Sequence, residues 1–127
     1  MRRGLTALAV GGSLLALALS GAGGALAGGK SKARAAKTKT VKVGDDYFGP
    51  AKLTVTKGTK IKWKWLDGNS NTHDVRLRKG PHGVKRFKSQ VAASDYSFSR
   101  KLKKPGKYRI YCSLHREMVM TIVVKRR

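Results

Sequence analysis

The sequence YCSLHREM at residues 111–118 places a thiol, an imidazole and a thioether close together in the chain. Upstream of it, residues 107–112 alternate polar and apolar side chains, which predicts a strand that buries one face and ends at Cys112. Downstream, residues 119–124 are rich in β-branched side chains and predict a closing strand. The stretch is therefore predicted to be a tight loop between two buried strands, with its sulfur and nitrogen atoms at one end of a β-structure.

The same period of two recurs along the chain from Val41 onward. It is clearest at residues 59–65, where both tryptophans point to one face and three lysines point to the other. Residues 52–56 alternate as well, and Lys57-Gly58 predicts a turn that would pair these two segments as a hairpin. These patterns favour strands with one buried face and one solvated face.

Two further strands are predicted at residues 72–77, with His73 on the inward face, and at residues 94–100. Between them, residues 79–89 are predicted to form a basic loop, and the connection at residues 79–93 to hold at most one turn of helix. About seven short strands with little or no helix predict an all-β fold of the Greek-key β-sandwich type.

The first 27 residues have the form of a secretory signal peptide, so the protein is predicted to be exported to the periplasm, the cell envelope or the medium. Two arginines precede an apolar stretch, and Ala25-Leu26-Ala27 supplies a cleavage site. The alternative is an uncleaved membrane anchor, but the glycine-broken stretch is shorter than the about 20 residues that a span needs. Sec and twin-arginine export both stay open, and no membrane span is expected in the mature chain.

The remaining chain is short and very basic. Without Arg2 and Arg3, the 29 basic residues become 27, which against 6 acidic residues gives a net charge of +21. Residues 28–40 are predicted to be a flexible basic tail, and residues 41–127 a single domain. Such a charge favours anionic partners, either an acidic redox protein or an anionic envelope surface.

Cys112 is the only cysteine and cannot form a disulfide within the chain, so it needs another explanation. A buried inert thiol is one possibility. The other is a metal site, because two histidines, one cysteine and a weak methionine ligand make the copper site of electron-transfer proteins. The second imidazole must be His73 or His82, and we favour His73 because His82 follows Gly80-Pro81 in the basic loop.

The chain resembles the plastocyanin, amicyanin and pseudoazurin group of cupredoxins over residues 41–124. The resemblance rests on residues 47–50, on the Trp63 strand, on Thr72-His73-Asp74-Val75 and on the Cys-x-x-His-x-x-Met loop. It implies a cupredoxin-like β-sandwich with one copper ion at one end. The implied metal ligands are His73, Cys112, His115 and Met118.

Two positions qualify this ligand set. Met118 fits a short, amicyanin-like loop, whereas Met120 fits the longer plastocyanin spacing; we favour Met118 because it leaves the final strand intact. Asp74 stands where the group commonly has Asn, at a position whose hydrogen bonds join the two ligand loops. The effect of this carboxylate on the reduction potential is left open.

The predicted function is that of an exported, mononuclear type 1 (blue) copper protein that shuttles single electrons between redox partners. It is not predicted to be an enzyme, because multicopper enzymes need more histidines than the 3 present. The alternatives are a copper carrier or storage protein, or a cationic binder of envelope polyanions. A monomer without a small-molecule substrate is expected, and nucleic acid is not the expected partner.

Overall fold

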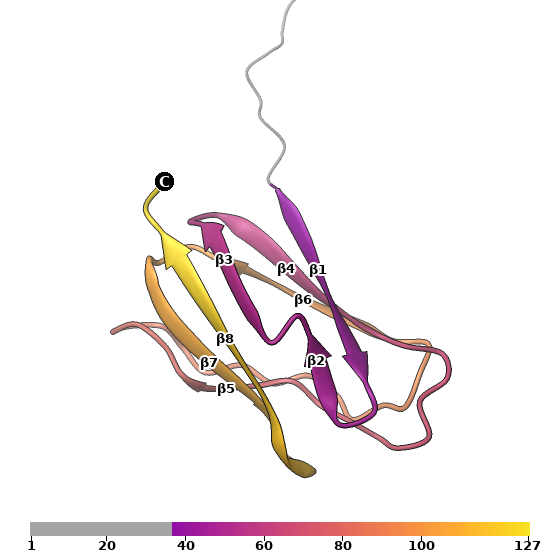
Figure 1. The fold of residues 1–127 in the computed structure, drawn as a ribbon. Coiled ribbons are helices and arrows are strands. Elements are labelled where there is room, and N and C mark those ends of the chain that lie inside the picture. The colour runs from indigo at the N-terminus through magenta and orange to yellow at the C-terminus, as the bar shows by residue number, and fades with distance from the viewer. Residues whose placement is uncertain (1–36) are drawn as a thin grey trace, which may run out of the picture. The chain divides into compact units, whose positions relative to one another are not determined.

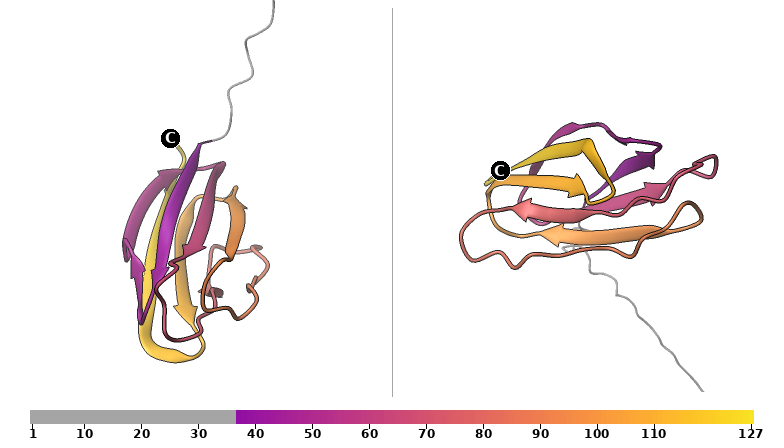
Figure 2. Two further views of the ribbon diagram at one scale, coloured as in Figure 1. Left: turned by 90° about the vertical axis from the view of Figure 1, so that its right-hand side faces the viewer. Right: turned by 90° about the horizontal axis from the view of Figure 1, so that it is seen from below.

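The computed structural model describes residues 37–127, which fold into eight strands in two facing sheets (Figures 1 and 2). The strands are β1 (Thr38–Gly44), β2 (Tyr47–Gly49), β3 (Lys52–Thr56), β4 (Thr59–Trp65), β5 (Arg76–Lys79), β6 (Ser97–Leu102), β7 (Gly106–Cys112) and β8 (His115–Lys125). Within residues 37–127 there is no helix. This confirms the predicted all-β sandwich, with eight strands in place of about seven.

Each sheet has four strands and mixes parallel with antiparallel pairs. One has the order β2-β1-β4-β6, in which β1 runs parallel to β4. The other has the order β3-β8-β7-β5, in which β3 runs parallel to β8 and β7 runs antiparallel to β8. Strands that follow one another in the chain therefore often lie in opposite layers, as in a Greek-key sandwich.

The predicted hairpin between residues 52–56 and 59–65 is wrong. The turn forms, with Gly58 at φ 88°, but β3 and β4 belong to different sheets. The turn thus carries the chain across the sandwich, and Val55 and Ile61 both contribute to the core between the layers. Alternation in sequence shows that each strand has a buried face, but it does not show which strand lies beside it.

Two predicted boundaries also change. The domain was expected to begin at Val41, but β1 begins at Thr38, so the last three residues of the predicted tail pair with Lys60–Lys62 of β4. Their side chains are exposed, so no apolar pattern marks them. The signal peptide at 1–27 and the rest of the tail lie outside the described residues.

The strand predicted at residues 72–77 is shorter than expected. β5 begins only at Arg76, and His73 instead forms an isolated bridge with Ala92. The backbone N–H of His73 donates to the Ala92 carbonyl at 2.9 Å, and that of Ala92 donates back at 3.1 Å. His73 is therefore fixed by a loop of the chain rather than by a regular sheet.

The core between the sheets is built around the two tryptophans. Trp63 packs against Phe87 and Phe98, and the ring of Trp65 meets Tyr96 edge-on at 4.7 Å. Burial of each fully buried large apolar side chain stabilises the fold by about 1.5–3 kcal/mol.

The start of β1 and the C-terminus lie at one end of the sandwich, and the turn between β7 and β8 lies at the other (Figure 1). No helix in residues 37–127 has the length and apolar character to cross a membrane.

Candidate metal centre

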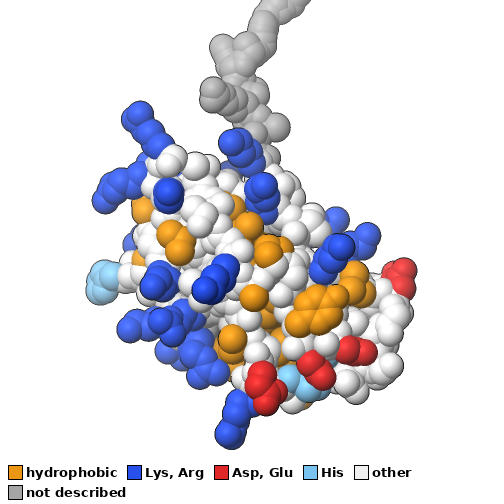
Figure 3. All heavy atoms as spheres, in the orientation of Figure 1, with side chains coloured by type: hydrophobic (Ala, Val, Ile, Leu, Met, Phe, Trp, Pro, Cys, Tyr) orange, Lys and Arg blue, Asp and Glu red, His pale blue; other side chains and the backbone are white. Residues whose placement is uncertain are grey.

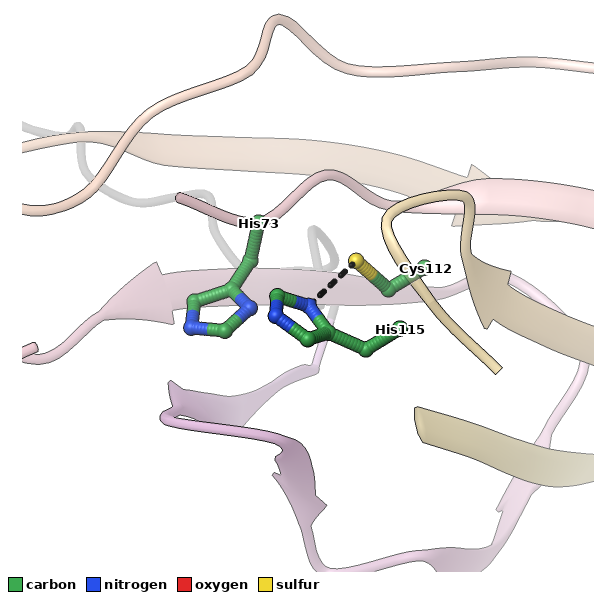
Figure 4. Close-up of side chains that lie close together, drawn as sticks. All are labelled: His73, Cys112 and His115. Carbon is green, nitrogen blue, oxygen red and sulfur yellow. Dashed lines mark hydrogen bonds between the residues drawn. The ribbon is translucent and has the colours of Figure 1, made fainter. Parts of the chain in front are cut away.

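Three of the predicted ligands meet at the end of the sandwich that carries the β7–β8 turn. The metal-binding atoms of His73, Cys112 and His115 all lie within 4.8 Å of one another. Cys112 Sγ is 3.7 Å from His115 Nδ1, and the two imidazole rings have their centroids 4.8 Å apart. Figure 4 shows the three side chains pointing toward one another, Cys112 and His115 from the β7–β8 turn and His73 from a separate part of the chain.

Two of these residues are placed by the tight connection of β7 to β8. Cys112 ends β7, His115 begins β8, and the two are paired across the ladder. The intervening Ser113-Leu114 leaves little freedom for either side chain. The third residue, His73, approaches from the opposite side, where the indole N–H of Trp65 donates to its carbonyl at 3.2 Å.

The outer nitrogens of both imidazoles face carboxylates. His73 Nε2 lies 2.9 Å from Asp45 Oδ1, and His115 Nε2 lies 3.2 Å from Asp46 Oδ1. These acidic residues occupy the turn between β1 and β2. A carboxylate on the outer nitrogen of a metal-binding histidine fixes the tautomer and the ring orientation, leaving the other nitrogen free for a metal.

His73 Nδ1 is the buried side-chain nitrogen or oxygen that has no hydrogen-bond partner among residues 37–127. An unpaired buried polar atom costs about 1–3 kcal/mol unless another group satisfies it. It lies in the same cluster as a thiol and a second imidazole, and copper takes this combination of soft sulfur and borderline nitrogen donors. The residues present therefore fit a copper ion.

Asp45 is held in its ionised form by its surroundings. Its carboxylate accepts hydrogen bonds from the backbone N–H groups of Ser70 and Asn71, at 2.7 and 3.0 Å. The Ser70 bond is the largest cause that lowers the pKa of Asp45 to about 2, and the bond with His73 is the next. Asp45 thus joins the β1–β2 turn to the loop that precedes His73.

Asp74 joins the two ligand-bearing loops from inside. Its buried carboxylate accepts hydrogen bonds from the Ser113 N–H and the Ser113 hydroxyl, each at 2.7 Å, and from Arg76 Nε at 2.8 Å. The Asp74 N–H in turn points to Cys112 Sγ at 3.5 Å. Burial alone would raise the pKa of Asp74, but the Ser113 and Arg76 hydrogen bonds outweigh it and lower that pKa.

For the Cys112 thiol, in contrast to Asp74, burial outweighs the hydrogen bonds. The loss of water around Cys112 raises the pKa of the thiol above its ordinary value, and the backbone N–H groups near the sulfur only partly offset this. A metal ion would reverse the balance, since a coordinating thiol is deprotonated by the ion's charge. The site is therefore suited to hold a neutral thiol when empty and a thiolate when loaded.

Both candidate axial methionines are buried in β8, but they differ in position. Met120 pairs across the ladder with Ile110, deeper in the sandwich, and its sulfur accepts the indole N–H of Trp63 at 3.4 Å. Met118 precedes Val119, whose ladder partner is Tyr111, so Met118 lies closer than Met120 to the turn that carries Cys112 and His115. The Met120 sulfur already has a core partner, which favours Met118 as the axial ligand.

His82 stays outside this cluster. It lies in the exposed loop after β5, where its carbonyl accepts a hydrogen bond from Lys104 Nζ at 3.1 Å.

Asp45 and Asp46 are the site residues that were not predicted from the sequence. Their only signal is an acidic pair in an otherwise basic chain, and nothing local links them to histidines 28 and 69 positions away.

Comparisons with known proteins agree with this geometry. The model of a family described as copper binding proteins, plastocyanin/azurin family, matches residues 35–125. A reduced variant of amicyanin is 20% identical, with a TM-score of 0.61 over 72% of this chain and 86% of that chain. A pseudoazurin from Sinorhizobium meliloti is 23% identical, with a TM-score of 0.58 over 69% of this chain and 73% of that chain. A search of curated proteins finds no match.

The fold and the site together define a cupredoxin, a β-sandwich with a copper site at one end. The chain belongs to the plastocyanin/azurin family of copper binding proteins. This confirms the family predicted from the sequence and its copper cofactor.

Proposed function

We propose that the protein is an exported, mononuclear type 1 copper protein that carries single electrons, with His73, Cys112, His115 and Met118 as ligands. The observation that carries the proposal is the unpaired, buried Nδ1 of His73, which lies in one cluster with the only thiol and a second imidazole. When bound, copper supplies a centre that alternates between Cu(I) and Cu(II). Family membership supports this reading.

The chain's own contribution is rigidity. Asp74 ties the Ser113 turn to the segment after His73, and Asp45 ties the β1–β2 turn to the segment before it. Each hydrogen bond to the buried Asp74 carboxylate stabilises the fold by about 1.5–3 kcal/mol. Ligands held in this way move little when an electron arrives or leaves, which keeps the reorganisation small.

His115 is the proposed route for the electron. Its side chain is 25% exposed, whereas that of His73 is 0% exposed, and Cys112 and Met118 are buried. Leu114 beside it in the chain is also exposed. A redox partner that docks at this end of the sandwich would contact the imidazole edge directly.

The decisive experiment is to add Cu(II) to the purified protein and to record its visible and paramagnetic-resonance spectra before and after ascorbate. We expect an intense thiolate-to-copper band at about 600 nm that bleaches reversibly. Cys112→Ser should remove the band, and His73→Gln should remove or strongly shift it. His82→Gln is the matched control and should leave the spectrum unchanged.

Two outcomes would redirect the assignment. A Cys112→Ser protein that stays blue would mean that the ligand set is wrong. A protein that binds copper without the blue band, and passes it quickly to a chelator, would favour the copper carrier or storage role.

A further inference from the structure

A basic groove lies along β5 and β7, outside the metal centre. It surrounds a hollow of about 650 Å³ and is lined by Arg78, Lys79, Gly80, Arg86, Lys107 and Arg109. Figure 3 shows Lys and Arg side chains gathered on the side where β5 and β7 lie, while Asp and Glu side chains gather toward the opposite lower corner. Five of the six residues in the groove therefore carry positive charge.

This charge is not compensated by the described residues. Among residues 37–127 the salt bridge between a Lys or Arg and a carboxylate is that of Arg76 with Asp74, and Arg76 does not line the groove. Within the groove, Lys79 and Arg109 are direct cross-strand partners, an arrangement in which like charges destabilise a sheet. An anion in the groove would relieve this repulsion.

Some of the guanidinium groups are already oriented. Arg78 stacks over the ring of Tyr111, 4.1 Å from its centroid. Arg86 also lines two adjoining hollows, and Arg100, which lines one of these, stacks over the Phe98 ring at 4.5 Å. Stacked guanidinium groups lose less freedom when they bind an anion, and their planar donor pattern matches phosphate oxygens. The adjoining hollows extend the groove into a basic track.

The track does not coincide with the proposed electron route. Arg109 precedes Cys112 by three residues on β7, about 10 Å along the strand. Arg109 is exposed and Cys112 is buried, so the two side chains lie on opposite faces of the sheet. The histidine edges at the metal centre face carboxylates, which do not attract an anion.

We propose that the basic groove binds a linear phosphate polymer. If the groove docked a protein partner, its surface would be expected to have an apolar centre. Among residues 37–127, however, the large exposed apolar side chains are Tyr47, Val91, Leu114 and Val119, and none of them lines the groove. A row of guanidinium and ammonium groups with adjoining hollows fits repeated phosphates instead.

The test is a titration of the purified copper-loaded protein with fluorescently labelled inorganic polyphosphate at rising NaCl concentration. Five phosphate contacts predict a slope of about −4 for the logarithm of the binding constant against that of salt concentration. The double substitution Arg78→Gln with Arg109→Gln should weaken binding roughly 40-fold at about 0.1 M salt and reduce the slope by about 1.6. Lys42→Gln with Lys60→Gln, on the outer face of β1 and β4, removes the same charge and should change neither value appreciably.

Three results would overturn the proposal. Equal weakening by the two double variants would mean that binding follows net charge rather than the groove. Vesicles of phosphatidylglycerol that bind the protein and are not displaced by polyphosphate would identify a membrane surface as the partner. Duplex DNA that resists displacement by polyphosphate would identify nucleic acid. Unfolding midpoints of both variants, measured in parallel, establish that each is folded.

Discussion

Asp46 Oδ1 lies 3.2 Å from His115 Nε2, so the most exposed imidazole of the metal centre has a carboxylate on its outer edge. The neighbouring Asp45 makes the equivalent contact with the buried His73, at 2.9 Å. One acidic turn between β1 and β2 thus reaches both histidines. This arrangement places negative charge at the end of the sandwich where we propose that electrons enter and leave.

Replacing Asp46 with Asn should raise the reduction potential of the copper centre. The negative charge of Asp46 stabilises Cu(II) more than Cu(I), and the substitution removes that charge. Exposed ion pairs contribute about 0.2–1 kcal/mol, which corresponds to about 10–40 mV for one electron. The potential is measured by redox titration of the blue band. Asp95→Asn removes the same charge from an exposed position and keeps a residue that tolerates the φ of 53° there. An equal shift in both variants would show that the effect is one of net charge.

The two buried methionines should respond differently to substitution by Leu. Met118→Leu is expected to raise the reduction potential and alter the spectrum, because it removes the proposed axial sulfur. Met120→Leu should leave the spectrum unchanged but destabilise the fold by about 1–3 kcal/mol, since the indole N–H of Trp63 loses its partner. Urea unfolding and visible spectra of both variants separate these effects. The reverse pattern would make Met120 the axial ligand.

Asp74→Ala should destabilise the protein by about 2–5 kcal/mol, because it removes the acceptor of three hydrogen bonds from a buried position. Asp74→Asn should cost less, since the amide oxygen can still accept the Ser113 N–H. The amide NH2 can donate to the Ser113 hydroxyl, so only the hydrogen bond from Arg76 is lost without replacement. Urea unfolding of the copper-free proteins gives the two values. Equal destabilisation by Ala and Asn would mean that the charge, rather than the acceptor geometry, maintains the link between the loops.

Tyr108 should make stability sensitive to alkaline pH. Burial raises the pKa of Tyr108 above its ordinary value of 10.0, and the hydroxyl donates to the Lys104 carbonyl at 2.7 Å. Above that ordinary value the unfolded chain ionises Tyr108 while the folded chain keeps it neutral, so stability falls as pH rises from about 10 toward the folded pKa. Below pH 10, Tyr108→Phe should be less stable than the parent by about 1 kcal/mol.

The control for this pH effect is the difference in the free energy of unfolding between the parent and Tyr108→Phe, because the two proteins share every other titratable group. That difference should shrink as pH rises above about 10. Denaturant unfolding at a series of pH values provides the measurement. A difference that stays constant to high pH would show that Tyr108 ionises as easily in the folded protein as in the unfolded chain.

Much of the fold was predictable because strands with one buried face impose a period of two on the sequence. This period located β4 and β7 closely, and it placed Cys112 at the end of a buried strand. It missed the first three residues of β1, whose side chains are all exposed and carry no apolar signal. The predicted hairpin of β3 with β4 was wrong, because a strand shows the same alternation whether the next strand lies beside it or in the opposite sheet.

The all-β class, the copper chemistry and three residues that the fold brings together could be predicted from the chain, since donor type and loop spacing are local properties. Which atoms surround those three residues depends on tertiary packing. The contacts of Asp45 and Asp46 with the two histidines depend on the packing of the β1–β2 turn against the end of the sandwich. The Trp63 contact that occupies the Met120 sulfur depends on the distance between the two sheets. Such contacts join residues far apart in the chain, and no local pattern specifies them.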